Sequence, residues 1–291
     1  MTMQKIVRID GGIGRVICSE PALRKMGEEE NIIVLTSWPD ALQYSPYLTK
    51  VYWSGFGNIF DALIEGNNLL TPEPYHNHLY YDEKHHLIQS FDYLLNGNDG
   101  ALVKPDLYLS EKEIGKGKYL VDRLRKGKTI VAIQPFGSTA VYKEDTNTVE
   151  DPTHRSLPFH VAWYIIDKLS DKCNFINLST INIYHPSVNN FNNNLRDSFG
   201  LVNACDCVIT MDSLLAHVGY SLGKTGMNLT GATSLTNFGY PHHYYTVSRD
   251  GYPKGKITFR IHEDNRFNKD ALNFSENELN DIIGEFRNLF V

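Results

Sequence analysis

The chain has 291 residues, 42% of them hydrophobic and 21% charged, and a formal net charge of −6 at pH 7. This length and composition predict a globular protein with a substantial core, organised as one large or two ordinary domains. Residues 1–118 hold 11 Lys and Arg against 16 Asp and Glu, a net charge of −5. An acidic first half argues against a nucleic-acid-binding protein, although a local basic groove can lie within an acidic total.

No stretch of the sequence reaches the roughly 20 apolar residues of a membrane-spanning helix, so no integral membrane segment is expected. Residues 1–5 lack the apolar core of a signal peptide, and a cytoplasmic protein is expected. The four cysteines are expected to be reduced thiols. Cys205 and Cys207 lie two residues apart with no second pair at ligand spacing, which favours buried small side chains over a metal site.

The first half has the pattern of a parallel βαβ unit. Residues 10–14 predict a tight glycine turn, and residues 15–26 a helix in which Pro21 lies near the first turn or produces a kink. A second, amphipathic helix is expected over 83–95. Residues 113–128 are expected to contain a short helix and to connect two domains. Four apolar runs are expected to form strands: 5–9, 31–36, 51–53 and 107–109.

The second half repeats this order of strands and helices. Strands are expected over 129–134, 174–178, 207–210 and 227–231. Helices are expected over 158–169, 194–204, 214–223 and 275–291, and the last begins with the capping pattern Ser275-Glu276-Asn277-Glu278. The sequence therefore predicts an α/β fold of two doubly wound, Rossmann-like domains with a cleft between them and ligands at the carboxyl ends of the strands. The predicted boundaries are 1–118, 119–275 and a C-terminal helix over 276–291.

The segment from Asp212 to His217 lies where a predicted strand ends and a predicted helix begins. Ser213 is expected to cap that helix through its side chain. The first N–H groups and the positive helix end would then face a ligand, an arrangement that suits a phosphate. The alternative is an ordinary strand-to-helix turn in which Asp212 and Ser213 only cap the helix.

Residues 204–217 resemble the segment that carries Asp-Thr-Gly-x-x-His in the bacterial lipopolysaccharide heptosyltransferase family. The spacing from Asp212 to His217 is kept, while Ser213 stands in place of Thr and Leu214 in place of Gly. In that family the segment holds the diphosphate of the donor. The resemblance implies the two-domain GT-B arrangement, in which the first domain binds the acceptor and the second binds a nucleotide-diphosphate sugar. This sugar nucleotide is a co-substrate, and no further cofactor is implied.

Two more segments resemble parts of the family's donor site. Residues 134–139 are similar to its Pro-Gly opening of the second domain, where Gly137, Ser138 and Thr139 can offer N–H and hydroxyl donors to a phosphate. Arg155 stands where the family has a Lys that contacts donor phosphate, and a guanidinium can bind phosphate with two hydrogen bonds. The alternative is a solvated Arg155 beside a helix start. Gly231 stands in a turn that lies close to the nucleotide sugar in the family.

The first glycine turn resembles the family's opening, with Gly14 and Pro21 in matching positions. The family has a general-base Asp after this Gly, but here the position is Arg15, whose guanidinium cannot accept a proton. Either Asp10, kept ionised by a nearby Arg15, or Glu20 has taken the role, or the reaction differs. A purely structural turn is the alternative. The spacing is not Gly-x-Gly-x-x-Gly, which argues against an NAD-dependent oxidoreductase.

No metal is expected. The histidines at 76, 78, 85 and 86 do not have zinc-ligand spacing, so a solvated loop and helix flank is favoured. No Asp-x-Asp pair ends a strand. The aromatic residues at 53, 56, 80 and 81 could stack on a sugar or a base, but for each of them a place in the core is favoured.

The expected function is transfer of a sugar from a nucleotide-diphosphate sugar to an acceptor hydroxyl, with inversion and without a metal. The implied acceptor is a surface glycan or the lipopolysaccharide core. One alternative is a phage enzyme that glycosylates hydroxymethylated DNA bases, since the Asn-, Tyr- and Lys-rich composition suits an AT-rich genome; such an enzyme would have to flip the base. A catalytically inactive nucleotide-sugar-binding module, suggested by Arg15, is another. The oligomeric state is left open.

Overall fold

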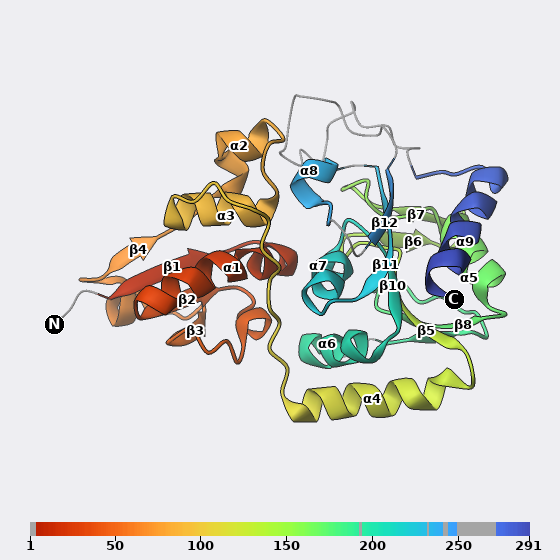
Figure 1. The fold of residues 1–291 in the computed structure, drawn as a ribbon, viewed down its shortest axis with the longest axis horizontal. Helices are drawn as coiled ribbons and strands as arrows, with labels where there is room; N and C mark the ends of the chain where they lie inside the picture. The colour runs from red at the N-terminus through yellow and green to blue at the C-terminus, as the bar shows by residue number, and fades with distance from the viewer. Residues whose placement is uncertain (1–3, 192–193, 232, 241–243, 249–271) are drawn as a thin grey trace. The chain divides into compact units, whose positions relative to one another are not determined.

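The structure is a computed structural model that describes residues 4–191, 194–231, 233–240 and 272–291, and the backbone of 244–248. The chain forms two compact units, Met1–Ser110 and Glu111–Val291 (Figure 1). Residue 118, where the sequence placed a domain boundary, lies inside helix α4 (Glu111–Arg125), and this helix belongs wholly to the second unit. The C-terminal helix α9 (Glu276–Phe290) packs against α5 (Phe159–Leu169) and is part of the same unit.

The first unit is built on a parallel sheet with strand order β3-β2-β1-β4. The strands are β1 (Lys5–Ile9), β2 (Ile32–Thr36), β3 (Lys50–Trp53) and β4 (Asn68–Leu70). The helices are α1 (Ile13–Glu29), α2 (His78–Tyr81) and α3 (Leu87–Asn96), with short helical turns at η1 (Pro39–Leu42), η2 (Phe60–Ile64) and η3 (Pro74–His76). α1 and α3 pack against each other, and η2 supplies Ile59, Leu63 and Ile64 to a cluster with Ile6, Ile33 and Leu35.

Two sequence expectations for this unit were wrong. Residues 107–109 form no strand in the described structure; the fourth strand of the sheet is β4, which pairs with β1 on the side away from β2 and is a three-residue run that follows Gly66. Pro21 lies well inside α1, which runs from Ile13 to Glu29, so of the two placements expected for it the first-turn one is excluded. The helix expected over 83–95 begins only at Leu87, because His86 caps it by accepting a hydrogen bond from the Ile88 N–H at 3.1 Å.

The second unit has a six-stranded parallel sheet with strand order β12-β11-β10-β5-β8-β9. The strands are β5 (Thr129–Gln134), β8 (Cys173–Asn177), β9 (Val188–Asn190), β10 (Cys207–Met211), β11 (Thr225–Thr230) and β12 (Tyr244–Ser248). From β5 the chain runs outward to β9 and then returns to β10 on the other side of β5. This order is that of a doubly wound fold, with its switch point between β5 and β10.

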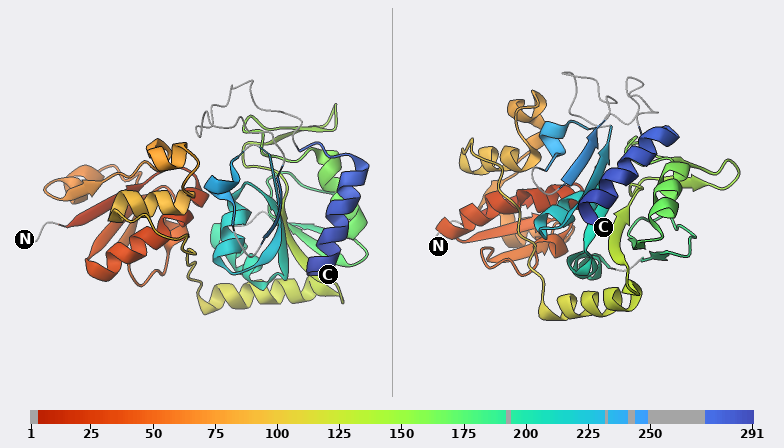
Figure 2. Two further views of the ribbon diagram at one scale, coloured as in Figure 1. Left: turned by 45° about the horizontal axis from the view of Figure 1, so that its top comes forward. Right: turned by 45° about the vertical axis from the view of Figure 1, so that its right-hand side comes forward.

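Helices cover both faces of this sheet. Figures 1 and 2 show α5 and α9 on one face, and α6 (Leu195–Ala204) and α7 (Leu214–Ser221) on the other. Val131, Ile209 and Met227 alternate toward α5 and α9 and form the larger core. The second unit also holds α8 (Leu235–Phe238) and an antiparallel hairpin of β6 (Val141–Lys143) and β7 (Thr148–Glu150).

Helix α4 is not a loose connection, because it packs closely on α6. A Cβ atom at Gly117 would lie 2.0 Å from the Gly200 carbonyl oxygen, so the two helices meet backbone to backbone. Arg196 forms two 2.7 Å hydrogen bonds to the Glu113 carboxylate across the same interface. The expectation that residues 113–128 only connect two domains was therefore wrong.

All four cysteines are buried free thiols, as expected from the sequence. Burial raises the pKa of Cys173 and of Cys205 to about 12, so these thiols stay protonated at neutral pH. Among the helices that the structure describes, none is both long enough and apolar enough to cross a bilayer.

Candidate functional site

The carboxyl ends of β5 and β10 lie side by side at the switch point of the second unit. Gln134 is the last residue of β5 and pairs in register with Thr210 of β10. β10 ends at Met211, and Asp212 and Ser213 come next in the chain. A doubly wound sheet leaves a crevice at the ends of these two strands, where ligands bind. The segment that the sequence singled out therefore lies at the position this topology reserves for a ligand.

Gln134, rather than Ser213, caps helix α7. Its Oε1 atom accepts a hydrogen bond from the Leu215 N–H at 2.8 Å and another from the Ser213 hydroxyl at 2.9 Å. Ser213 is the N-cap residue, but its side chain makes no capping bond, so the predicted role of its hydroxyl was wrong. Within the described residues, the N–H groups of Ser213 and Leu214 have no hydrogen-bond acceptor. These two donors lie at the positive end of a helix, which favours an anion there.

Arg155 lies against the turn at Asp212, as the sequence suggested. Its Nη1 atom donates to the Asp212 carbonyl oxygen at 3.0 Å and lies 3.8 Å from a carboxylate oxygen of the same residue. The two side chains are only 16% and 4% exposed, respectively. The segment is fixed beside β5 by the Leu157 N–H, which donates to the Pro135 carbonyl at 2.9 Å. A guanidinium is thus held within contact of the α7 start, with further N–H groups in its planar fork.

Asp151 organises the loop after β5, a role that the sequence did not indicate. Its two carboxylate oxygens accept hydrogen bonds from the hydroxyls of Thr139, Thr153 and Ser156 and from the backbone N–H groups of Thr153 and Ser156, at 2.6–3.0 Å. Burial alone would raise the pKa of Asp151, but these hydrogen bonds outweigh it and lower the pKa to about 2. Asp151 is therefore ionised at neutral pH and holds the loop in one conformation.

This arrangement changes the donors predicted for a phosphate. The Gly137 N–H donates to Ser156 Oγ at 2.9 Å, and the Thr139 hydroxyl donates to Asp151, so both are already used within the protein. A Cβ atom at Gly137 would lie 3.2 Å from Asp151 Oδ2, so a side chain there would press on the Asp151 carboxylate. Ser138 is exposed, and in the described structure its hydroxyl has no partner. The Gly137 N–H and the Thr139 hydroxyl are therefore occupied within the protein, whereas the Ser138 hydroxyl can meet a ligand.

His217 and Gly231 lie in the buried part of this region. His217 is one helical turn beyond the α7 start, and its Nδ1 atom is hydrogen-bonded to the Tyr240 hydroxyl. Its ring also makes an edge contact with Phe238, with centroids 6.2 Å apart. The imidazole is therefore committed to an aromatic cluster, which gives it a packing role next to the predicted phosphate position. Gly231 follows β11 directly and is buried.

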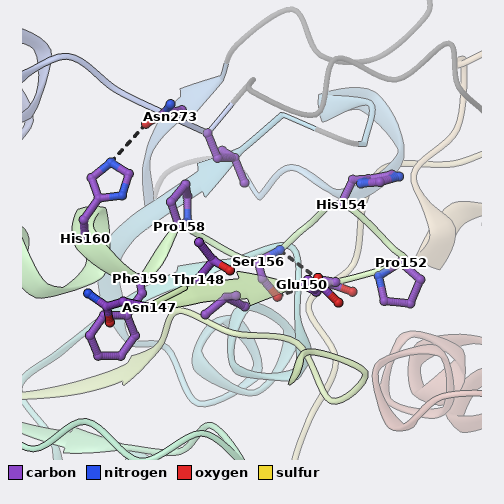
Figure 3. Close-up of a pocket in the computed structure, with 13 residues that line it drawn as sticks. Asn147, Thr148, Glu150, Pro152, His154, Ser156, Pro158, Phe159, His160 and Asn273 are labelled. Carbon is purple, nitrogen blue, oxygen red and sulfur yellow. Dashed lines mark hydrogen bonds between the residues drawn. The ribbon is translucent and has the colours of Figure 1, made fainter. Parts of the chain in front are cut away.

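A cavity of about 570 Å³ lies beside the loop that holds Asp151, and Asp151 is one of its lining residues (Figure 3). It is lined by the end of the β6–β7 hairpin, the start of α5, and residues 272–273. In Figure 3, His160 and Asn273 lie at one end, joined by a 3.0 Å hydrogen bond, Pro152 and His154 lie at the other, and Ser156 and Glu150 lie between them. The volume falls within the range of small-molecule pockets. Ser156 is shared between this cavity and the Gly137 turn, so the cavity adjoins the candidate donor site.

In the first unit, three polar side chains meet where β1, β2 and β3 end. Asp10 Oδ1 accepts hydrogen bonds from the Ser54 hydroxyl at 3.2 Å and from the Ser37 hydroxyl at 3.4 Å. Arg8 forms an ion pair with Asp10 Oδ2 at 2.6 Å. The strand register explains why Asp10, Ser37 and Ser54 meet. Arg8, Leu35 and Tyr52 are paired across the sheet, and the three polar residues each come two positions after one of them, on the same face. The Asp10 side chain is 38% exposed and can meet a ligand.

Arg15 is turned away from Asp10, contrary to expectation. Its Nη2 atom donates to Glu73 at 3.0 Å and to the Pro72 carbonyl at 3.1 Å, and its guanidinium lies over the ring of Tyr75. The cation that pairs with Asp10 is Arg8 instead. Arg15 therefore ties α1 to the segment after β4, and Gly14 lies inside the first turn of α1 rather than in the loop.

Glu20 is buried and cannot contact an acceptor. Its side chain is 2% exposed, and Oε2 accepts a hydrogen bond from the Asp106 N–H at 2.9 Å. Burial raises the pKa of Glu20 to about 7, while the Asp106 N–H and Arg24 partly offset this effect. A raised pKa is typical of a general base, but the burial of this carboxyl assigns it to the core. The proposal of Glu20 as the base was wrong on this ground.

The four histidines have structural contacts in the first unit. His85 Nε2 is hydrogen-bonded to Asp99 at 2.5 Å, and His86 caps α3. Among the described residues, no three His, Cys, Asp or Glu side chains gather as metal ligands would.

The chain has the GT-B class of fold, as predicted. It consists of two doubly wound parallel units, and each has polar groups at the carboxyl ends of its strands. No protein-family model and no curated protein sequence matches the chain. Solved glycosyltransferase structures do match it in fold. The family 9 glycosyl transferase of Veillonella parvula is 13% identical over 85% of this chain and 86% of its own, with a TM-score of 0.61.

Two Escherichia coli structures give similar values. ADP-heptose lipopolysaccharide heptosyltransferase II is 14% identical, covers 97% of this chain and 99% of its own, and has a TM-score of 0.60. The iron-containing dodecameric glycosyltransferase TibC is 12% identical, covers 100% of this chain and 79% of its own, and has a TM-score of 0.64. At these identities the likeness is one of fold, and it extends over nearly the whole chain.

Proposed function

We propose that this chain is a glycosyltransferase that moves a sugar from a nucleotide-diphosphate sugar to the hydroxyl group of a glycan acceptor. The observation that carries the proposal is the placement of Arg155 and the α7 start together at the β5–β10 switch point of a GT-B fold. Two of the solved neighbours support it further, since heptosyltransferase WaaC and TibC have been crystallised with ADP and with ADP-D-β-D-heptose, respectively.

The diphosphate would bind in the second unit. The N–H groups of Ser213 and Leu214 and the positive end of α7 would meet one phosphate, and the positively charged guanidinium of Arg155 would meet the other. When the bond between sugar and diphosphate breaks, negative charge grows on the leaving phosphate, and these fixed donors stabilise it without reorganisation. Ser138 can add a hydroxyl donor. The groups present are cationic and N–H donors, so the proposed reaction needs no metal.

Asp10 would act as the general base in the first unit. Catalysis requires a carboxylate within hydrogen-bond reach of the acceptor hydroxyl. Asp10 is the partly exposed carboxylate of the β1 loop, and the hydroxyls of Ser37 and Ser54 hold one of its oxygens in place. Removal of the acceptor proton by Asp10, with direct attack on the sugar from the face opposite the diphosphate, gives a single displacement with inversion. Arg15 plays no part in this chemistry, so its substitution for the family Asp does not by itself abolish activity.

The test is product analysis by mass spectrometry. The full chain is incubated with ADP-, UDP- and GDP-linked sugars and with two acceptor sets, lipopolysaccharide-type glycans and DNA that contains hydroxymethylated bases. We expect a glycan product whose mass increases by one sugar, together with release of the nucleoside diphosphate. Donor binding without any transfer would instead identify an inactive binding module, and transfer to DNA would identify the base-modifying alternative. Absence of both binding and transfer would reject the proposal.

A further inference from the structure

Three exposed aromatic side chains lie at or just after the ends of β2 and β3, the strands whose ends also carry the Ser37 and Ser54 hydroxyls that donate to Asp10. Trp38 follows β2 and is 40% exposed; Trp53 ends β3 and is 51% exposed; Phe56 is 57% exposed. The sequence favoured core positions for Trp53 and Phe56, and that expectation was wrong. Large aromatic surfaces are usually removed from water, so three exposed rings at these neighbouring strand ends point to a ligand that covers them.

Trp38 is fixed by the turn that follows Asp10. Its Nε1–H donates to the carbonyl oxygen of Gly11 at 3.0 Å, and Gly11 directly follows Asp10. Gly11 has a φ of +102°, a conformation that residues with a side chain rarely adopt, so the turn that presents this carbonyl depends on glycine. A hydrogen-bonded indole has little rotational freedom left to lose when a ligand packs on it.

Trp53 ends β3 and directly precedes Ser54. Its ring lies close to Gly55, where an added Cβ atom would come within 2.4 Å of the ring, so a side chain there would displace the indole. Phe56 packs edge to face on the same ring, with centroids 5.9 Å apart and an interplanar angle of 73°. Ser54 in turn donates to Asp10. Trp38 is therefore bonded to the residue that follows Asp10, and Trp53 precedes the residue that donates to Asp10.

The chemistry of this surface fits a sugar without formal charge. A pyranose ring has a face of C–H groups, which pack on the negative face of an aromatic ring, and a rim of hydroxyls that can donate to a carboxylate. A phosphate or carboxylate on the acceptor would approach Asp10 with like charge, and Arg8, the cation that contacts Asp10, is already paired with it at 2.6 Å.

We propose that Trp38, Trp53 and Phe56 form a platform that binds the acceptor through an uncharged sugar residue and presents its hydroxyl to Asp10. This inference rests on the proposed function for the role of Asp10, but the binding surface is independent of catalysis. It sets the acceptor class as a glycan that ends in a neutral sugar.

The test uses the chain's own fluorescence, since two of its three tryptophans are in the platform. In a Trp163→Phe background, emission is recorded during titration with neutral disaccharides of glucose, galactose and mannose. The same disaccharides with a phosphate or a uronic carboxylate, and a single-stranded DNA with hydroxymethylated bases, are titrated in parallel. We expect at least one neutral disaccharide to shift the emission in a saturable way and to bind more tightly than its charged counterparts.

The variants Trp38→Ala and Trp53→Ala should each weaken that binding by roughly 2- to 10-fold, the range for one aromatic contact. Affinity in these variants is measured by calorimetry, because each removes a fluorophore. Trp53→Phe should restore most of the loss, and Trp163→Ala, in the other unit, should change nothing. Circular dichroism checks that each variant is folded.

Tighter binding of charged disaccharides or DNA, or unchanged affinity in both folded Trp→Ala variants, would overturn the platform. Binding of neutral sugar with no transfer from any nucleotide sugar would reject the proposed function and leave the platform intact. Transfer to a glycan that binds independently of both tryptophans would reject the platform and leave the proposed function intact.

Discussion

The guanidinium of Arg155 donates a hydrogen bond to the backbone carbonyl of Asp212 at 3.0 Å, although 57 residues separate them in the chain. Arg155 precedes α5, whereas Asp212 ends the turn before α7, and the two meet because β5 and β10 are neighbours in the sheet. A cation held at a helix start by the backbone needs little reordering when an anion arrives, which is the condition for strong electrostatic stabilisation.

Substitution of Arg155 by Ala should weaken binding of the nucleotide sugar by about 1.5–3 kcal/mol, the contribution of a charged hydrogen bond. Calorimetry with the donor alone measures it. Arg155→Lys should recover part of the affinity, since the charge remains but the planar fork is lost. Arg287→Ala is the control, because that guanidinium lies on α9 and contacts Lys168 and Asp171. If the folded Ala variant binds the donor normally, Arg155 is not part of the site.

Asp10→Asn keeps the shape of the side chain and removes its basicity, so turnover should fall roughly 10²- to 10⁴-fold while donor affinity stays unchanged. Ser54→Ala and Ser37→Ala should have smaller effects, roughly 2- to 10-fold each, because each removes one hydrogen bond that orients the carboxylate. Initial rates at saturating donor give these values. Asp82→Asn, which changes a surface carboxylate paired with Lys84, serves as the control. Near-normal turnover in Asp10→Asn would rule Asp10 out as the base.

Glu20 should make the protein less stable as pH rises from about 4.5 to about 7. Burial raises its pKa from 4.5 to about 7 in the folded state, so within this window the unfolded chain releases the proton and the folded chain retains it. The folded state then binds more protons than the unfolded state, so the free energy of unfolding falls with increasing pH. The effect is on the order of 3 kcal/mol.

The variant Glu20→Gln should abolish that pH dependence and be more stable than the parent at pH 8. Urea unfolding at several pH values measures both effects. Glu28→Gln on the same helix is exposed and should leave the profile unchanged. A parent and a Glu20→Gln variant with parallel profiles would show that Glu20 has an ordinary pKa.

Gly117→Ala should destabilise the second unit by about 1–3 kcal/mol or more, the usual cost of overpacking. A methyl group at this position would lie 2.0 Å from the Gly200 carbonyl oxygen, so α4 must move away from α6. Gly115→Ala is a matched control on the same helix, because nothing lies within 4 Å of its added Cβ atom. That change should instead stabilise the helix by up to about 1 kcal/mol. Thermal unfolding distinguishes the two, and equal melting temperatures would contradict the close packing of α4 on α6.

Turnover should survive treatment with a chelator, because the proposed donor site neutralises the diphosphate with Arg155 and helix N–H groups. Rates are compared before and after dialysis against EDTA, and again after addition of magnesium, manganese or iron. Complete loss of activity that a metal restores would show that a cation holds the diphosphate instead.

Local signals in the sequence predicted many helices and strands accurately. The capping box of Ser275 and Glu278 starts α9 as expected, and β1, β5 and α5 lie within one residue of their predicted ends. These features depend on backbone hydrogen bonds and side-chain periodicity within a few residues, so the sequence alone contains them. β4 was missed because a three-residue strand forms only when its neighbour β1 supplies the partner groups.

The residues proposed for the site divide in the same way. The turn at Asp212 could be found from its place at the junction of two predicted elements, and Arg155 from its resemblance to the family's phosphate-binding Lys. The hydrogen bonds of Asp10 with Ser37 and Ser54, the capping of α7 by Gln134 and the commitment of Arg15 to Glu73 could not. Each joins segments far apart in the chain, and such contacts are fixed by the register of parallel strands and by the packing of helices on them, which only the tertiary structure decides.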